Sequence, residues 1–329
     1  MESRTVFVQV RDLKQWFPAK SKTLFGKRRY VKAVDGVDLD LYQGETLGVC
    51  GESGCGKSTL IRTILRVIEP TSGSIVFDGQ DITHLSRKQM KTIRANMQIV
   101  FQDPYSSLDS RWKVGRIIAE PFKINGVQMS RAEEKERVAG LMKLVGLNPS
   151  YAERYPHEFS GGQRQRIAIA RALATNPKLL MLDEAVSALD VSVRAQILNL
   201  LKSLQDELKL TYVFVSHDLS VVEHICDRVM IMYLGRVVEI GRKDDIFNNP
   251  QHPYTKALLS AIPMVHDDGL KRERIRLEGD IPSPINPPSG CRFRTRCPYA
   301  TERCESEPAL TDVGQGHLVN CHLCKDARI

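Results

Sequence analysis

A glycine-rich run at residues 51–59 (GESGCGKST) contains the residue types that cradle a phosphate group. It fits the pattern G-x-x-x-x-G-K-[ST] at Gly51, Gly56, Lys57 and Ser58. Glycines let backbone N–H groups curve around phosphate oxygens, and a helix beginning near Lys57 would add the positive end of its dipole. We expect Lys57 to reach the β- and γ-phosphates of a nucleotide and the Ser58 hydroxyl to bind Mg²⁺. The predicted cradle also includes the other residues of the loop: Ser53, Gly54, Cys55 (as a small residue that fits) and Thr59.

The elements around this loop are predicted from apolar runs and helical spacing. Residues 45–50 (ETLGVC) read as a buried strand and residues 59–67 (TLIRTILRV) as a helix. From residue 6 to about 249, strand-like runs alternate with helical patterns, which predicts an α/β fold around a mostly parallel sheet. The runs at 97–101, 179–182 and 212–215 are apolar throughout, as strands covered on both faces should be. Residues 104–176 look largely helical and are predicted to form a separate lobe.

Two acids follow one of these strands directly. The run LLML ends in Asp183 and Glu184, which places the first carboxylate at the carboxyl end of the sheet, where such folds bind ligands. We expect Asp183 to help hold Mg²⁺, mostly through water, and Glu184 to polarise the attacking water. Two solvated acids would be the simpler interpretation if no phosphate loop lay in the same chain.

A second anion cradle is predicted at Ser160, Gly161, Gly162 and Gln163 (SGGQ). Serine is a good N-cap, and the two glycines leave backbone N–H groups uncovered at the start of a helix. One nucleotide does not need two cradles within one subunit. The second cradle is therefore predicted to serve a nucleotide held by another subunit in a head-to-tail dimer.

Taken in order, these motifs resemble the ATP-binding cassette family over nearly the whole of the body. The order is the phosphate loop, Gln102, SGGQ, LLMLDE, SALD and a strand ending in Ser216-His217-Asp218. The resemblance implies a P-loop fold with a RecA-like core, an antiparallel β edge and a helical subdomain. It implies that Gln102 touches Mg²⁺ and senses the γ-phosphate, that His217 contacts the γ-phosphate, and that Ser160, Gly161 and Gln163 clamp the partner's ATP. It also implies a loop across the dimer, made of Ala188, Leu189 and Asp190.

Adenine in this family stacks on an aromatic residue upstream of the phosphate loop. Phe17 aligns best by position, and Trp16 and Tyr30 are the alternatives. The chain departs from the family at two places. Phe159 stands where leucine is usual, and Ala185-Val186 replaces the common Pro-Thr. Neither change removes a catalytic group, so hydrolysis is expected to remain.

The segment after the cassette resembles the extension of oligopeptide- and dipeptide-importer ATPases, through NPQHPYT at 249–255 and the tail CRFRTRCPYATERC. Within this group, the sequence most resembles the second of the two ATPases of such permeases. This implies a second, similar but non-identical ATPase subunit, two transmembrane permease subunits and, indirectly, an extracytoplasmic substrate-binding protein. The chain would lie peripherally on the cytoplasmic face of the inner membrane. We expect an ATPase domain over 1–250 (core about 1–103 and 177–250, helical subdomain about 104–176) and an extension over 251–329.

Five cysteines lie in the last forty or so residues, which favours metal ligation in a reducing compartment. Only one pair has the C-x₂-C gap typical of zinc sites, and the looser spacing resembles the tail of some dipeptide importers that carry a [4Fe–4S] cluster. We expect such a cluster, with zinc and unligated thiols as alternatives. The expected ligands are Cys291, Cys297, Cys304 and Cys321, with Cys324 able to replace the last.

Composition and charge limit the classes of function that the chain can have. The chain has 329 residues and a formal charge of +8, which permits contact with nucleic acid or an anionic membrane but requires neither. It contains no apolar run long enough to span a membrane and no signal-peptide layout at its start. A nucleic-acid-handling cassette ATPase is the competing class, yet one compact cassette without a heptad run argues against it. Other cargoes (nickel, glutathione, oligosaccharide or antimicrobial peptide) are compatible with the same ATPase.

Overall fold

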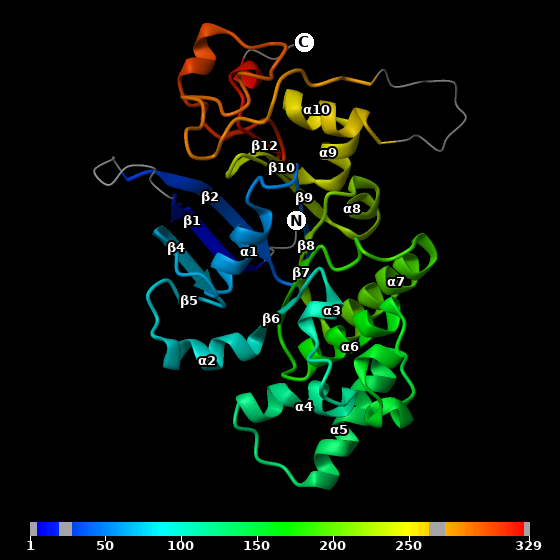
Figure 1. The fold of residues 1–329 in the computed structure, drawn as a ribbon. Helices are drawn as coiled ribbons and strands as arrows, with labels where there is room; N and C mark the ends of the chain where they lie inside the picture. The colour runs from blue at the N-terminus through cyan, green and yellow to red at the C-terminus, as the bar shows by residue number, and fades with distance from the viewer. Residues whose placement is uncertain (1–4, 20–27, 263–273, 326–329) are drawn as a thin grey trace. The chain divides into compact units, whose positions relative to one another are not determined.

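The computed structural model describes residues 5–19, 28–262 and 274–325, and its chain divides into two compact units (Figure 1). The first unit is built from Met1–Leu41, Thr46–Thr83 and Ser216–Ile329. The second is built from Tyr42–Glu45 and His84–Val215. The expected α/β fold is confirmed, because strands and helices alternate along the chain and both units contain β-sheet.

The first unit contains an antiparallel sheet of four strands in the order β2-β1-β4-β5. A register shift interrupts the β1–β4 pairing between Arg11 and Lys14, where Asp12 has a φ of 43°. Gly73 of β4 faces this bulge, and a Cβ there would lie 2.5 Å from the Asp12 carbonyl oxygen. Such an irregularity bends the strand and increases its local twist. The strands are β1 (Val6–Pro18), β2 (Tyr30–Tyr42), β4 (Ser72–Phe77) and β5 (Gln80–Asp81).

A second group of strands in the first unit has the order β11-β12-β10-β9-β3. Strand β3 is fully buried and pairs in parallel with β9, whereas β9, β10 and β12 pair antiparallel. Gly48 of β3 lets helix α8 approach closely, since a Cβ there would lie 2.7 Å from the Val222 side chain. The strands are β3 (Thr46–Cys50), β9 (Arg228–Tyr233), β10 (Arg236–Arg242), β11 (Thr311–Asp312) and β12 (Leu318–Val319), and the helices are α1 (Lys57–Ile64), α8 (Leu219–Ile225), α9 (Lys243–Asn248), α10 (Pro253–Ser260), η3 (Glu302–Glu305) and η4 (His322–Lys325).

The second unit combines three parallel strands with a mostly helical segment. Strand β7 (Leu179–Asp183) lies between β6 (Met97–Val100) and β8 (Thr211–Val215), and the buried faces of β7 and β8 explain their uninterrupted apolar sequences. The helical content predicted for 104–176 is confirmed. The helices of the unit are α2 (Arg87–Asn96), α3 (Pro104–Ser107), α4 (Val114–Ile124), α5 (Arg131–Leu144), η1 (Pro149–Glu153), η2 (Pro156–Glu158), α6 (Gly161–Leu173) and α7 (Val191–Leu208).

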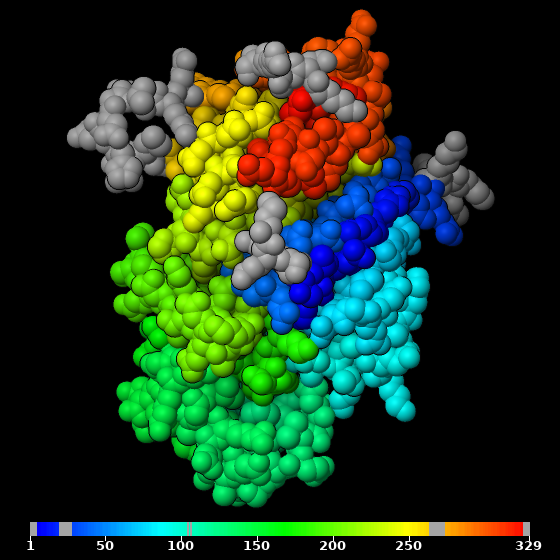
Figure 2. Space-filling view, turned by 180° about the vertical axis from the view of Figure 1, so that it is seen from behind, coloured from blue at the N-terminus to red at the C-terminus, as the bar shows by residue number. Residues whose placement is uncertain are grey.

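The C-terminal tail is part of the first unit and packs on its sheets (Figure 2, orange to red beside blue). Strand β12 extends the sheet by pairing with β10, where Ile240 lies opposite Leu318. The Phe293 ring is 1% exposed and lies 5.3 Å from the Tyr233 ring and 5.4 Å from the Tyr254 ring. Even the proline-rich stretch before the tail contacts the body, because the Lys32 N–H donates to the Pro284 carbonyl.

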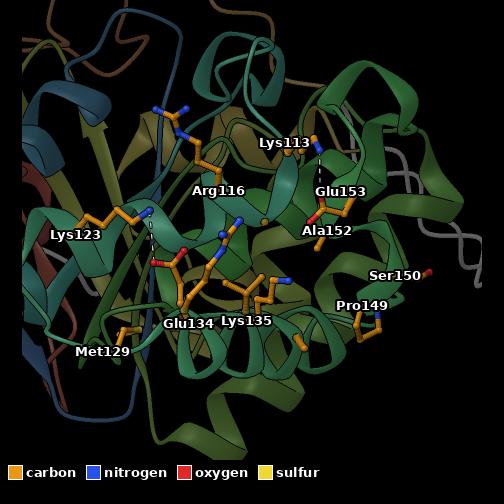
Figure 3. A pocket seen from close by; sticks show the side chains of 14 residues that line it. Lys113, Arg116, Lys123, Met129, Glu134, Lys135, Pro149, Ser150, Ala152 and Glu153 are labelled. Carbon is orange, nitrogen blue, oxygen red and sulfur yellow. Dashed lines mark hydrogen bonds and ion pairs between the residues drawn. The ribbon is translucent and has the colours of Figure 1, made fainter.

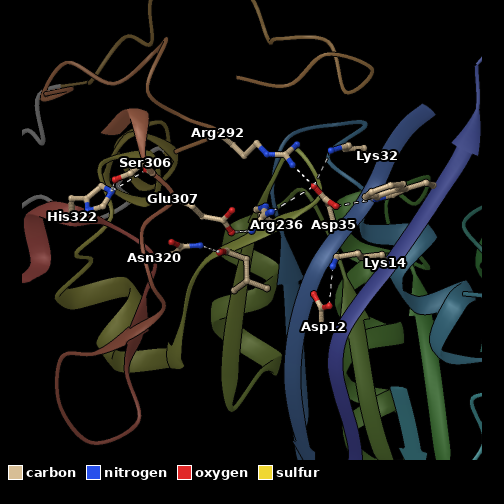
Figure 4. Close-up of polar contacts among 12 residues, drawn as sticks. Asp12, Lys14, Lys32, Asp35, Arg236, Arg292, Ser306, Glu307, Asn320 and His322 are labelled. Carbon is tan, nitrogen blue, oxygen red and sulfur yellow. Dashed lines mark hydrogen bonds and ion pairs between the residues drawn. The ribbon is translucent and has the colours of Figure 1, made fainter. Parts of the chain in front are cut away.

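Asp35, on β2, is the polar centre of this packing (Figure 4). It is 3% exposed and accepts hydrogen bonds from the Arg292 guanidinium and from the Trp16 indole N–H at 2.9 Å. Arg236 adds a second cation at 3.6 Å and Lys32 a third at 3.9 Å. A buried carboxylate needs such partners, since an unpaired buried charge costs several kcal/mol.

None of the helices in the described part of the chain is both long enough and apolar enough to cross a membrane.

The buried Asp35–Arg292 pair predicts a large loss of stability in Asp35→Asn. The variant keeps the size of the side chain but leaves the Arg292 guanidinium buried without its counter-charge, so the free energy of unfolding should fall by about 3–5 kcal/mol. Asp40→Asn is the matched control, because the Arg11 and Asp40 side chains of its ion pair are 42% and 32% exposed and the pair should contribute at most ~1 kcal/mol. Urea unfolding followed by circular dichroism measures both, and equal midpoints for the two variants would contradict the prediction.

Candidate nucleotide-binding site

The predicted phosphate loop runs from the end of β3 to the first turn of α1, and its glycines adopt backbone conformations that other residues avoid. Gly51, Gly54 and Gly56 have φ values of 147°, 79° and 107°. A Cβ at Gly51 would lie 2.2 Å from the Met232 carbonyl oxygen, and one at Gly56 would lie 2.0 Å from the Ala33 carbonyl oxygen. Both contacts are impossible for a side chain, so the shape of the loop depends on glycine. Helix α1 has Gly56 as its N-cap, a residue with no side chain to cap the helix, as is common where a helix N-terminus receives an anion.

Lys57 begins α1 and turns back over the loop. Its side chain is almost fully buried, and Nζ donates to the carbonyl oxygens of Gly51 at 2.8 Å and Glu52 at 3.1 Å. The ammonium is therefore held at the mouth of the cradle. Burial raises the pKa of the neighbouring Cys55 thiol, which keeps the thiol protonated. This agrees with a small residue that fits the loop and does not agree with a reactive cysteine. Ser58 and Thr59 are half-buried in the same first turn, and Ser53 and Gly54 are exposed.

His217 lies in the same unit as the loop. The residue before it, Ser216, donates its N–H to the carbonyl of Val49 at 3.2 Å. Val49 belongs to β3, the strand that leads into the phosphate loop. His217 is exposed, and the next residue, Asp218, caps α8 by accepting from the Ser220 N–H at 3.1 Å. This arrangement brings His217 beside the carboxyl end of β3.

Among the three aromatic candidates for stacking on adenine, Trp16 and Tyr30 have other partners. The Trp16 indole donates to Asp35, its ring lies under the Lys32 ammonium at 4.7 Å, and the Tyr30 ring lies 6.3 Å away. Phe17 is the next residue on β1 and is half-buried. Successive side chains of a strand point to opposite faces, so Phe17 does not share the face of Trp16.

In the second unit, the predicted carboxylates and Gln102 gather at one end of the parallel strands. Val100 of β6 pairs with Leu182 of β7, so Gln102 and Asp183 follow neighbouring strand ends. Asp183 is buried and ends β7, and Gln102 is exposed. Glu184 has a φ of 50°, a left-handed conformation that is strained for a residue with a side chain. Such strain is concentrated at functional sites.

The SGGQ segment starts helix α6 with a capping box. The Gln163 side chain accepts from the Ser160 N–H at 3.0 Å, and the Ser160 hydroxyl accepts from the Gln163 N–H at 3.4 Å. Gly162 allows close packing on α7, because a Cβ there would lie 2.3 Å from a Val193 methyl group. Phe159 is buried before the cap and contacts the Tyr151 ring, so the departure from leucine keeps its apolar packing.

The predicted dimer loop at 188–190 ends in another helix cap. Asp190 accepts from the Val193 N–H at 3.0 Å and from the Ser192 hydroxyl at 2.9 Å, and these hydrogen bonds lower the pKa of its carboxyl group. Leu189 is buried and Ala188 is exposed. Asp190 therefore has a structural role within its own subunit in addition to any contact with a partner.

A conspicuous pocket of the second unit contains none of the predicted site residues. It encloses about 820 Å³ between α4, α5 and η1 (Figure 3). Two ion pairs cross it, Lys113–Glu153 at 2.8 Å and Lys123–Glu134 at 3.5 Å. A phosphate cradle made of backbone N–H groups is shallow, so the volume of a cavity does not locate it.

The predicted [4Fe–4S] cluster is wrong for the described residues, which contain no group of three or more His, Cys, Asp or Glu placed to hold a metal ion. Among the tail cysteines, Cys324 and Cys321 hydrogen-bond to each other, and the Cys304 sulfur lies 3.8 Å from the Thr301 hydroxyl. The tail is held to the unit by the buried Phe293, the Arg292–Asp35 pair and the β10–β12 pairing. The expected ligand set was Cys291, Cys297, Cys304 and Cys321.

Sequence reasoning also missed three residues that support the phosphate loop. The Glu52 N–H donates to the Tyr254 hydroxyl at 2.9 Å, and the Glu52 carboxylate pairs with Arg296 at 2.8 Å. The available signal was Glu52 itself, a negative charge inside a loop predicted to bind anions.

Comparison with known proteins agrees with this geometry. Residues 34–187 match the family described as ABC transporter, and residues 238–304 match the family described as oligopeptide/dipeptide transporter, C-terminal region. The oligopeptide transport ATP-binding protein AppF of Bacillus subtilis is 53% identical over 324 residues, which cover 98% of each chain. The dipeptide transport ATP-binding protein DppF of Escherichia coli is 54% identical over 315 residues, covering 95% of this chain and 93% of that protein.

Solved structures show the same fold. The ATP-binding cassette MJ0796, in a dimeric post-hydrolysis state bound to ADP and Pi, has a TM-score of 0.64 and 28% identity, covering 72% of this chain and 98% of that one. The structure of cbiO1 from Clostridium perfringens has a TM-score of 0.63 and 31% identity, covering 74% and 91%. This chain therefore belongs to the ABC transporter family, as an ATP-binding and ATP-hydrolysing subunit that carries the C-terminal region of oligopeptide/dipeptide transporters.

Proposed function

We propose that this chain powers the uptake of dipeptides or oligopeptides by hydrolysing ATP within a membrane importer. The observation that carries the cargo class is the C-terminal region at 238–304, together with relatives named for oligopeptide and dipeptide transport that match nearly the full chain. An ATPase subunit of this kind does not touch its cargo. Peptide is therefore preferred to nickel, glutathione or oligosaccharide on likeness to these relatives alone.

The proposed nucleotide site assigns phosphate binding to the loop at 51–59. Glycine backbone N–H groups would hold the phosphate oxygens, and Lys57, already positioned over the loop by two carbonyl groups, would exchange those contacts for the β- and γ-phosphates. Phe17 would stack on the adenine ring. The donor set Ser58, Gln102 and Asp183, a hydroxyl, an amide and a carboxylate, fits the oxygen preference of Mg²⁺. When bound, Mg²⁺ would neutralise phosphate charge.

The proposed chemistry is hydrolytic phosphoryl transfer in which the protein positions groups and forms no covalent bond. Glu184 would accept a proton from the attacking water, and His217 would contact the γ-phosphate. The left-handed backbone at Glu184 supports this role, because strained backbone conformations are concentrated at functional sites.

A second, similar ATPase subunit would complete each nucleotide site. The exposed start of α6 supports this, since its capping box fixes a helix N-terminus with two glycines and no acidic side chain in the first turn. Ser160, Gly161, Gly162, Gln163 and Asp190 would face the partner's nucleotide. The likeness to a cassette described as dimeric supports the same arrangement.

We propose an ATPase domain at 1–250, with its core at about 1–103 and 177–250 and a helical subdomain at about 104–176, followed by an extension at 251–329. The family match at 34–187 lies within the proposed ATPase domain, and the C-terminal-region match at 238–304 spans its junction with the extension. Two transmembrane permease subunits would hold the ATPase pair on the cytoplasmic face of the membrane, and an extracytoplasmic binding protein would deliver the cargo.

The test is ATP-dependent peptide uptake into vesicles that contain the assembled importer. Labelled dipeptide should accumulate only with this subunit and ATP, and labelled nickel, glutathione and oligosaccharide should not. Uptake of one of those cargoes in place of peptide would overturn the cargo assignment.

Glu184→Gln should slow ATP hydrolysis by about 10²–10⁴-fold, because the amide cannot accept the proton of water. ATP binding should remain, since the substitution keeps the size of the side chain. Phosphate release by the assembled complex and nucleotide binding to the same sample measure the two effects. Glu223→Gln, on the exposed face of α8, is the control and should hydrolyse ATP like the unmodified protein. Unchanged hydrolysis in Glu184→Gln would remove this residue from the mechanism.

Gly56→Ala should weaken nucleotide binding by about 100-fold or more, because its Cβ would collide with the Ala33 carbonyl and displace the cradle. Gly44→Ala is the matched control. Gly44 also has a positive φ, of 77°, but a Cβ there meets no atom within 4 Å, so only about 1 kcal/mol of stability should be lost. Equilibrium titration with a fluorescent ATP analogue compares the two variants, and equal affinities would contradict the prediction.

A further inference from the structure

The C-terminal tail contacts the phosphate loop itself, through Arg296. Its guanidinium donates to both carboxylate oxygens of Glu52, at 2.8 and 3.3 Å, and to the Tyr233 hydroxyl at 3.4 Å. The Arg296 side chain is 8% exposed in this pair and the Glu52 side chain 24%. A bidentate ion pair that is this deeply buried is stronger than a typical surface ion pair.

The backbone of Glu52 is held from the same side. Its N–H donates to the Tyr254 hydroxyl, and Tyr254 packs against Tyr233 at 4.8 Å and against Phe293 of the tail at 5.4 Å. The second residue of the loop is thus fixed through its N–H by α10 and through its carboxylate by the tail. Glu52 also supplies one of the two carbonyl oxygens that hold Lys57.

The charge of Glu52 explains why such a contact matters. A carboxylate in a loop that receives a triphosphate would repel its ligand, because like charges a few ångströms apart interact unfavourably even in water. Arg296 neutralises that carboxylate and directs it away from the loop toward the tail. The segment CRFRTR therefore contacts the unit at three places. Arg292 pairs with Asp35, Phe293 packs in the aromatic cluster, and Arg296 pairs with Glu52 of the loop.

We propose that Arg296 is a positioning residue for ATP binding, and that the C-terminal tail controls the affinity of the phosphate loop by neutralising Glu52. This rests on the proposed nucleotide site at 51–59. It gives the extension a function within its own subunit, because any partner or modification that drew the tail away would expose the Glu52 charge and weaken ATP binding.

The test is ATP affinity of the full chain, measured by titration with a fluorescent ATP analogue and with unlabelled ATP in competition. Arg296→Gln should bind ATP about 10-fold more weakly, a coupling within the range found between linked sites. Arg296→Lys keeps the positive charge and should stay within about threefold of the unmodified protein. Arg294→Gln is the matched control, because Arg294 bonds to Ser289 within the tail and should bind ATP normally.

The decisive variant combines Arg296→Gln with Glu52→Gln. If neutralisation is the mechanism, removing the carboxylate should restore affinity to within about threefold, whereas a merely structural role for Arg296 would leave the double variant as weak as the single one. Glu52→Gln alone should bind ATP at least as tightly as the unmodified protein. The proposal can therefore be tested with this variant even if Arg296→Gln proves unstable. Unchanged affinity in Arg296→Gln, weaker binding in Glu52→Gln, or no restoration in the double variant would each overturn the proposal. Absence of binding by the unmodified chain would instead overturn the proposed nucleotide site.

Discussion

The close approach of three backbone segments around the phosphate loop is the constraint on which the rest of the site depends. The loop is packed between the beginning of β2 and the turn from β9 to β10, where the Gly235 N–H donates to the Cys55 carbonyl at 2.8 Å and the Asp35 N–H to the Gly235 carbonyl at 2.9 Å. Gly51 and Gly56 touch carbonyl oxygens on either side. Because there is no room for a Cβ, the loop keeps its curved shape without a ligand, and the entropy cost of ordering it is met during folding.

The tail reinforces this support from the same side of the unit. Asp35 contributes its N–H to the turn beside the loop and its carboxylate to Arg292, so one residue links the loop support to the tail. Arg296 and Phe293 add two further links. Burying these charges is unfavourable unless they remain paired, which makes the tail and the loop support depend on each other. A metal centre is not needed to explain how this segment is held.

The local parts of the site could be predicted from the sequence, because each rests on a short pattern with a direct physical meaning. A buried strand followed by glycines and Lys57, a strand ending in two acids, and Ser160 before two glycines all specify backbone geometry within a few residues. The strands at 46–50, 179–183 and 211–215 and the helical segment after residue 104 were accessible for the same reason. Helix α1 begins at Lys57, as the phosphate-loop pattern predicts, and ends at Ile64, before the end of the apolar spacing at 59–67.

The contacts of the tail could not be predicted, because they join residues that are distant in the sequence. Arg296 and Glu52 are 244 residues apart, and Arg292 and Asp35 are 257 apart. Cysteine spacing suggested a cluster, yet spacing carries no information on which direction each thiol faces. The same limit applies to the aromatic candidates: all three of Trp16, Phe17 and Tyr30 are aromatic, and only their contacts in the fold, such as the indole hydrogen bond to Asp35, separate them.

Several residues assigned to ligand contacts also have a structural role, and this overlap follows from the chemistry of helix ends. Ser160 and Gln163 close a capping box, and Asp190 caps α7. A capping side chain and a partner's phosphate both accept hydrogen bonds from the same N–H donors, at the positive end of the helix dipole. Loss of activity after substituting such a residue therefore does not identify a ligand contact. Glu184 differs, because none of the described helices begins at this residue and its left-handed backbone directly follows the end of β7.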